Sequence, residues 1–184
     1  MSVTVATTVE PASGSTAAPI TAEKPRSSRV LRVGLGFLAL LLLVRLFVAE
    51  PVRTDGRSME PTLHDGDALV IDLLSYRFTD PAVGDIVVAT APDTGQSVVK
   101  RVVAVAGDLI GIEDGVLMRN GLAIDEPYAN QDQMGGYYWG PVTVPEGQVF
   151  LLGDNRLESV DSREYGPVSI DEIDGRYVSR LWPR

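Results

Sequence analysis

The sequence predicts a mainly β protein, an antiparallel, barrel-like β domain preceded by a single transmembrane helix. From about residue 52 onward, short runs rich in Val, Ile and Leu alternate with Gly-containing turns, which is typical of antiparallel strands. No run after residue 55 is long enough for an amphipathic helix. A continuous apolar run stands upstream. These features predict a tail at 1–28, an anchor at 29–49 and one folded domain at 50–184.

The first 49 residues are predicted to be a cytoplasmic tail and a membrane anchor. Residues 1–28 are rich in Ser, Thr, Ala and Pro without apolar periodicity, so we expect disorder. The uncharged run Val33–Val44, continued to Ala49, reaches the lower length limit for crossing a bilayer. A buried core helix is disfavoured because the run is apolar on every face, and a cleaved secretory signal because Phe47 stands where a small residue is needed. Basic residues ahead of the run predict that the folded domain lies outside the cytoplasm.

The folded domain contains seven predicted strands, at residues 68–72, 85–90, 97–106, 109–113, 116–119, 142–144 and 148–153. Asp114-Gly115 and Asn120-Gly121 are hairpin turn signals on either side of the fifth run. Residues 135–140, GGYYWG, interrupt the pattern and are predicted as an aromatic loop. Such a loop is either a lid or a packed Ω-loop, and the packed loop is the commoner case.

The composition excludes several functional classes. Residues 1–49 carry five basic and two acidic side chains, whereas residues 50–184 carry 11 and 23. An acidic domain argues against nucleic acid as a partner, because duplex binding depends on Lys and Arg at phosphates. Cysteine is absent and there is one histidine, so we expect no transition-metal site, and no cofactor is implied.

Ser58, in GRSMEPTL (56–63), is a candidate nucleophile that needs a base. His64 is near it in the sequence, but a lone histidine beside Asp65 and Gly66 is more typical of a solvated loop. The alternative base is a lysine kept neutral by burial. The chain has two lysines, and Lys24 falls in the predicted tail, which leaves Lys100.

Lys100 lies within an apolar run, SVVKRVVAVA, and has two interpretations. A solvated lysine that points outward is the commoner case, and a base that points into a cleft is the functional one. Strand alternation puts Val98, Lys100 and Val102 on one face, and Val99 and Arg101 on the other, so periodicity leaves both open. A third segment, 151–168, combines a strand with a polar loop that turn residues alone would also explain.

Together, in order and spacing, these three segments resemble the bacterial type I signal peptidases, membrane-anchored Ser/Lys peptidases. GRSMEPTLHDGD resembles the nucleophile motif, KRVVAVAGD the lysine motif, and GDNRLESVDSREYG the family's G-D-N-x-x-x-S-x-D-S-R-x-x-G motif. The resemblance covers roughly residues 45–182 and includes an upstream anchor. Ala104 and Ala106 occupy positions where the family usually has Gly and Pro.

The resemblance implies roles for individual residues. Ser58 would be the nucleophile, Lys100 the general base and then acid, and Ser159 the hydroxyl that orients the lysine amine. A hydroxyl suits this role because a carboxylate would raise the pKa of the amine.

Four further residues have implied roles in the same loop and turn. Asp161 and Arg163 would form a structural ion pair, and Asp154 and Asn155 would shape the turn. Some family members have a serine two residues before the nucleophile, where this chain has Gly56. The oxyanion would then be bound by the backbone N–H of Ser58 and of Gly56 or a neighbour.

The resemblance also implies the substrate and the setting. The substrates would be signal peptides of secretory preproteins with an Ala-x-Ala pattern before the cut, bound as an added strand along 51–56 and 97–100. Candidate pocket residues are Val52, Met59, Leu63, Val98 and Val99. The expected location is the plasma membrane, with one span, a cytoplasmic N-terminus and an extracytoplasmic catalytic domain, so the lipid bilayer is an expected partner.

Two alternatives remain. A self-cleaving Ser/Lys repressor-type protease would share a related β fold, but it needs a DNA-binding part upstream. A non-catalytic, membrane-anchored extracytoplasmic β module would need neither Ser58 and Lys100 nor Ser159, so their joint presence favours the peptidase.

Overall fold

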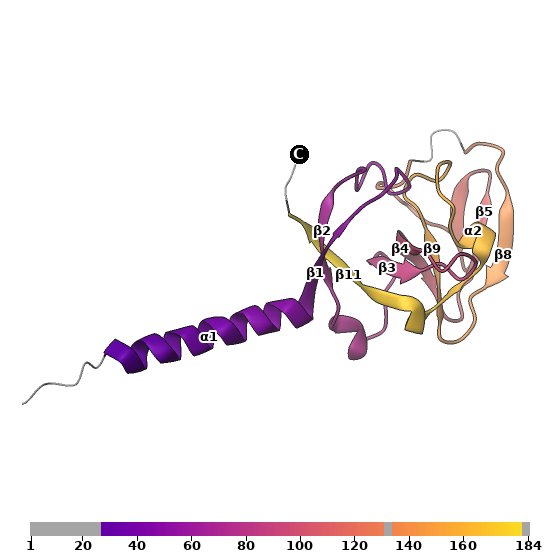
Figure 1. Ribbon diagram of the computed structural model, residues 1–184. Helices are drawn as coiled ribbons and strands as arrows, with labels where there is room; N and C mark the ends of the chain where they lie inside the picture. Colours follow the sequence, from indigo (N-terminus) through magenta and orange to yellow (C-terminus); the bar gives the residue numbers. More distant parts are fainter. Residues whose placement is uncertain (1–26, 131–133, 182–184) are drawn as a thin grey trace, which may run out of the picture. The chain divides into compact units, whose positions relative to one another are not determined.

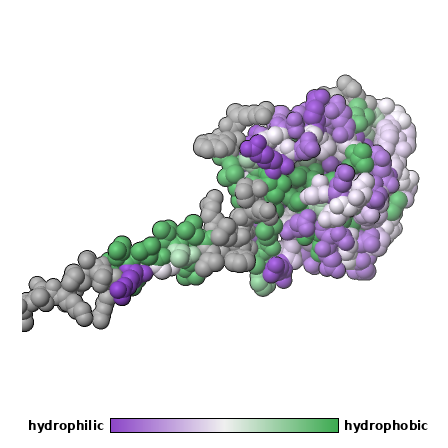
Figure 2. All heavy atoms as spheres, viewed as in Figure 1, coloured by the Kyte–Doolittle hydropathy of each residue, from purple (hydrophilic) through white to green (hydrophobic). Residues whose placement is uncertain are grey.

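The computed structural model describes residues 27–130 and 134–181, so the predicted disordered tail, apart from its last two residues, lies outside the described part. The chain divides into two units, residues 1–38 and 39–184. α1 (Ser27–Val48) is a 22-residue helix that begins two residues before the predicted anchor. Its large apolar side chains between residues 30 and 42 are exposed, as Figure 2 shows for one face. No helix in the described ranges is both long enough and apolar enough to span a membrane.

Within the described residues, the larger sheet has seven strands in the order β1-β2-β11-β3-β4-β9-β10, with all neighbours antiparallel (Figure 1). The strands are β1 (Ala49–Arg53), β2 (Ala68–Asp72), β3 (Ile86–Thr90), β4 (Ser97–Val105), β9 (Gln148–Leu152), β10 (Val168–Ser169) and β11 (Ile173–Arg180). The predicted mainly β, antiparallel class is confirmed. The hydrogen-bonded order ends at β1 and β10 among the described strands, so this sheet is open and not a closed barrel.

The smaller sheet has four described strands, in the order β7-β6-β5-β8. They are β5 (Leu109–Glu113), β6 (Val116–Arg119), β7 (Leu122–Ala123) and β8 (Trp139–Thr143). Both turns beside β6 have positive φ at their two central residues, +50° and +81° at 114–115 and +55° and +77° at 120–121, as type I′ hairpins require. Within the aromatic segment 135–140, only Trp139 is packed, with its ring 5.0 Å from the Phe150 ring, whereas Tyr137 and Tyr138 are exposed.

The remaining described helices are short: η1 (Ser75–Arg77), α2 (Ser162–Tyr165) and η2 (Ile170–Glu172). α2 begins after Asp161, whose side chain accepts a hydrogen bond from the Arg163 backbone N–H as an N-cap. The polar loop predicted after β9 therefore contains one helical turn.

Three apolar clusters form the core. One packs the smaller sheet against β4 and β9 and includes Ile110, Leu117 and Phe150. A second includes Val87, Val102 and Leu151 of the larger sheet. The third joins Met59 and Leu63 to β2 and β3. The third cluster matters for function, because it fixes the segment that carries Ser58.

Candidate active site

Ser58 lies in a tight segment between β1 and β2 that the core holds in place. Met59 and Leu63 are buried, and the Leu63 N–H donates to the Met59 carbonyl at 2.9 Å. Gly56 has a φ of +94°, a conformation in which any side chain would be strained. The glycine two residues before Ser58 is therefore required by the backbone turn.

The two predicted oxyanion donors differ in availability. The Gly56 N–H donates to Asp65 Oδ1 at 3.0 Å. The Ser58 N–H makes no hydrogen bond within the described part of the chain. The Gly56 N–H was expected to bind the oxyanion, but it already donates to Asp65. The Ser58 N–H is therefore the available oxyanion donor of the two.

Lys100 is a buried lysine that contacts Ser58 directly. Its Nζ lies 2.8 Å from Ser58 Oγ, although the two residues are 42 positions apart. The residue is only 5% exposed, and this burial is the main cause that lowers the pKa of Lys100. Asp161 raises this pKa by a smaller amount, and Arg163 lowers it further. Of the two interpretations left open by strand periodicity, the structure gives the inward-pointing one.

Arg101, the next residue in β4, is anchored on the opposite side. Its Nε and Nη2 donate to the two carboxylate oxygens of Asp154 at 2.8 and 2.7 Å. Asp154 is fully buried and also accepts from Thr62 Oγ1 at 2.5 Å. Asp154 was expected only to shape a turn, whereas its main contact is a bidentate ion pair with β4.

Asn155 and Gly153 hold the Ser58 segment against the loop after β9. The Asn155 N–H donates to the Ser58 carbonyl at 3.0 Å, and its Nδ2 donates to the Arg57 carbonyl at 3.2 Å. A Cβ at Gly153 would lie 2.3 Å from Ser159 Oγ and 2.5 Å from the Ser58 carbonyl. Only glycine permits this approach.

Asp161 and Arg163 form a buried ion pair, with Arg163 Nε 2.8 Å from Asp161 Oδ1. Arg163 Nη2 also donates to the carbonyl of Arg156 at 2.6 Å, which ties the loop together. Ser159 Oγ donates to Asp161 Oδ2 at 2.7 Å. The predicted bond between Ser159 and the Lys100 amine is not formed among the described residues; the Ser159 hydroxyl donates to Asp161 instead.

The five candidate pocket residues divide into two groups. Met59 and Leu63, at 3% and 1% exposed, belong to the core and offer little surface to a ligand, contrary to expectation. Val52, Val98 and Val99 are partly exposed. Among the described residues, strands β1 and β4 offer free edges here: β1 pairs with β2 alone, and residues 97–100 of β4 pair with β3 but not with β9.

His64 has no contact with Ser58 in the described structure. Its Nδ1 lies 4.0 Å from Asp67 Oδ2, and its side chain is 43% exposed. Within residues 27–130 and 134–181, no three His, Cys, Asp or Glu side chains are grouped so that they could hold a metal ion.

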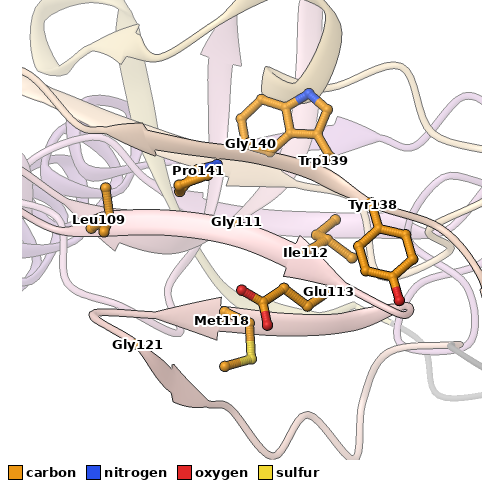
Figure 3. Close-up of a pocket in the computed structure, with 10 residues that line it drawn as sticks. All are labelled: Leu109, Gly111, Ile112, Glu113, Met118, Gly121, Tyr138, Trp139, Gly140 and Pro141. Carbon is orange, nitrogen blue, oxygen red and sulfur yellow. The ribbon is translucent and has the colours of Figure 1, made fainter.

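Cavities do not coincide with these contacts. A cavity of about 640 Å³ lies on the smaller sheet, and its lining residues come from β5, β6, β8 and the turns beside them (Figure 3). A second cavity, of about 550 Å³, is lined by Arg57, Glu60 and Asn155 among others. The second cavity is the one that adjoins the Ser58 segment.

The sequence interpretation missed several charged or polar residues around this site. Arg101 was noted for its face of the strand but given no role, and Glu126, Tyr128 and Arg156 were not considered. The sequence did contain a signal for Arg101, which is a second charged residue within an apolar strand. Because a buried charge needs a partner, such a residue indicates an ion pair.

Comparisons with known proteins show the family to which the chain belongs. The family model described as "Signal peptidase, peptidase S26" matches residues 27–182. A "Probable signal peptidase I-1" of Synechocystis sp. is 40% identical, over 79% of this chain and 78% of that protein. A "Signal peptidase I" of Leptolyngbya laminosa is 35% identical over 88% and 82%, and one of Bacillus caldolyticus is 37% identical over 79% and 86%.

Proposed function

Because this chain belongs to the signal peptidases of the peptidase S26 family and is a serine endopeptidase, we propose that it cleaves signal peptides with Ser58 as nucleophile and Lys100 as general base. The observation that carries this proposal is the 2.8 Å distance between Lys100 Nζ and Ser58 Oγ. A buried amine is kept neutral more easily than an exposed one, and only the neutral amine accepts a proton.

In the first step, Ser58 Oγ attacks the carbonyl carbon of the scissile peptide bond, and its proton passes to Lys100 Nζ. The carbonyl oxygen becomes an oxyanion, for which the Ser58 N–H is the proposed donor. Lys100 then gives the proton to the leaving nitrogen, the C–N bond breaks, and an acyl-enzyme remains on Ser58.

The second step regenerates the enzyme. A water molecule gives one proton to Lys100 Nζ as its oxygen attacks the ester carbon. The bond to Ser58 Oγ then breaks, and Lys100 returns the proton to that oxygen. Ser159 and Asp161 do not take part in these proton transfers directly. The Ser159 hydroxyl donates to the Asp161 carboxylate, which Arg163 also binds, and these contacts hold the loop in place.

The proposed substrates are secretory preproteins with small residues at the first and third positions before the cut. An extended peptide would add main-chain hydrogen bonds at the free edges of β1 and of residues 97–100. Val52, Val98 and Val99 would form the shallow pockets for alternate side chains. Small substrate side chains suit such pockets, because pockets lined by valine side chains are shallow.

The proposed setting is the plasma membrane, with the predicted anchor 29–49 holding the N-terminus in the cytoplasm and the catalytic domain outside; this proposal rests on the sequence, since no described helix has the length and apolarity of a span. The exposed apolar side chains of α1 and the basic residues ahead of the apolar run support this orientation. A shared membrane would raise the effective concentration of a membrane-inserted signal peptide near Ser58.

The test uses the full-length chain in detergent and a preprotein with an Ala-x-Ala cut. Ser58→Ala and Lys100→Ala are each expected to lower kcat/KM by at least about a thousandfold, because each removes half of the dyad. Product formation by gel or mass spectrometry measures this.

Two control variants match these changes. Lys24→Ala removes the other lysine of the chain, and His64→Ala removes its one histidine; both are expected to cleave normally. An active Lys100→Ala variant beside an inactive His64→Ala variant would assign the base to histidine and overturn the proposal.

A further inference from the structure

The two proposed catalytic residues are both anchored at one short segment, residues 153–156. Asp154 binds Arg101, the residue after Lys100, with both carboxylate oxygens. Asn155 binds the carbonyl of Ser58 through its backbone N–H. The distance between Ser58 Oγ and Lys100 Nζ therefore depends on where this segment lies.

Lys100 needs this anchor because its strand is only half paired at that position. Lys100 pairs with Val87 of β3, but pairing of β4 with β9 begins one residue later, at Arg101 and Leu152. The Arg101 side chain adds a second contact on that side, because its guanidinium binds Asp154 in the loop after β9. Without the guanidinium contact, the part of β4 next to Lys100 would be held on the β9 side by main-chain pairing alone.

A second segment, residues 126–130, contacts this anchor from outside. The Tyr128 ring lies 3.9 Å from the Arg101 guanidinium carbon, within the range of a cation–π contact. The Tyr128 hydroxyl donates to Glu126 Oε1 at 2.8 Å, and Arg156 Nη2 donates to the same oxygen at 2.7 Å. Arg156 Nε in turn donates to the carbonyl of Gly153 at 3.0 Å.

Burial makes this arrangement more than a surface contact. The side chains of Glu126 and Arg156 are 0% and 1% exposed. The Asn130 N–H donates to the Asp154 carbonyl at 2.9 Å, so the backbone of the second segment is joined to the anchor as well. Burial together with Glu126 raises the pKa of Tyr128, so its hydroxyl stays a donor.

From these contacts we propose that Tyr128 and Glu126 are positioning residues for the Ser58–Lys100 pair. Tyr128 restrains the Arg101 guanidinium against Asp154, and Glu126 restrains Arg156 and through it the carbonyl of Gly153. Neither residue touches the reacting atoms. This inference rests on the proposed function and extends it to two residues that lie 26 and 28 positions beyond Lys100 in the sequence.

The experiment measures kcat and KM of full-length variants in detergent with an Ala-x-Ala preprotein. Tyr128→Leu is expected to lower kcat about tenfold with KM changed less than about twofold, because misplacement affects the reacting atoms and not the free edges. Tyr128→Phe keeps the ring over Arg101 and is expected to retain most of kcat. Glu126→Gln keeps an acceptor oxygen but loses the charge, and about a threefold loss of kcat is expected.

The matched control is Tyr138→Leu, since Tyr138 is 68% exposed on the smaller sheet and is expected to leave both constants unchanged. A Tyr128→Leu variant with normal kcat, or a loss confined to KM, would overturn the proposal. If Tyr128→Leu does not fold, the other two variants decide. A normal kcat in Glu126→Gln would overturn the proposal, and so would a Tyr128→Phe variant that is more impaired than Glu126→Gln. An active Ser58→Ala variant would instead overturn the proposed function, so the two failures are distinct.

Discussion

Two regions of the molecule have interiors of opposite character. Around Ser58 and Lys100, three ion pairs are buried: Arg101–Asp154, Arg156–Glu126 and Arg163–Asp161. The core cluster under the smaller sheet consists of apolar side chains. The larger of the two cavities does not lie beside the buried ion pairs. The smaller sheet has a cavity of about 640 Å³, whereas the cavity that adjoins the Ser58 segment has about 550 Å³.

This difference shows which property locates the site. Burying an ion pair costs desolvation free energy, and apolar residues of similar volume often stabilise a fold as well or better. Three buried pairs around one lysine are therefore better explained by a need to fix positions than by stability. Buried charge locates the reactive pair, whereas the larger cavity lies elsewhere.

Asp154→Ala is expected to have the largest effect, because it leaves the Arg101 guanidinium buried without its carboxylate. We expect the free energy of unfolding to fall by about 3–5 kcal/mol and cleavage to be lost. Chemical denaturation and a peptide-cleavage assay measure the two effects.

A double variant separates stability from position in the same pair. Arg101→Met combined with Asp154→Leu removes both charges, and we expect it to regain most of the lost stability while cleavage stays impaired. Normal cleavage by the double variant would mean that the pair is needed for folding alone.

The ion pair Asp161–Arg163 is expected to have an intermediate effect, on pH dependence. Asp161 raises the pKa of Lys100 and Arg163 lowers it, while burial keeps the pKa below the ordinary value of 10.5. The base works when deprotonated, so activity rises with pH through this pKa. Arg163→Met should move the rise to higher pH and Asp161→Asn to lower pH, in profiles of kcat/KM. Shifts in the same direction for both variants would contradict this.

Local sequence patterns predicted most of the fold. The predicted runs 68–72, 109–113 and 116–119 coincide with β2, β5 and β6, since β-branched runs and Asp-Gly or Asn-Gly turns act locally. β11 was missed, although it lies between β2 and β3 within the larger sheet. Its register shifts near Ile173 and Tyr177 break the alternation of side chains, and Gly175 replaces an apolar residue. A Cβ at Gly175 would lie 2.6 Å from Ile71 Cγ2, so tertiary packing selects the glycine.

The site was predictable only in part. Spacing and family resemblance selected Ser58 and Lys100, and the structure brings both to hydrogen-bond distance. The partners of Ser159 and Gly56 were not predictable, because each polar group had a competing acceptor, Asp161 or Asp65, that only the folded chain brings close. The roles themselves stay predictions until the variants are measured.

Substitutions in the cavity of the smaller sheet are expected to have the smallest effect. Tyr138→Ser changes an exposed side chain of its lining, and Glu113→Gln removes the one carboxylate among the described lining residues. We expect kcat/KM within about twofold of the original protein and unfolding free energies within about 0.5 kcal/mol. Trp139, in the same lining, serves as the contrast, because its Nε1 donates to the Arg163 carbonyl at 3.1 Å. Trp139→Phe should therefore disturb cleavage where Tyr138→Ser does not. A rise in KM with Tyr138→Ser or Glu113→Gln would show that substrate reaches the smaller sheet, and buried charge would then no longer be sufficient to locate substrate binding.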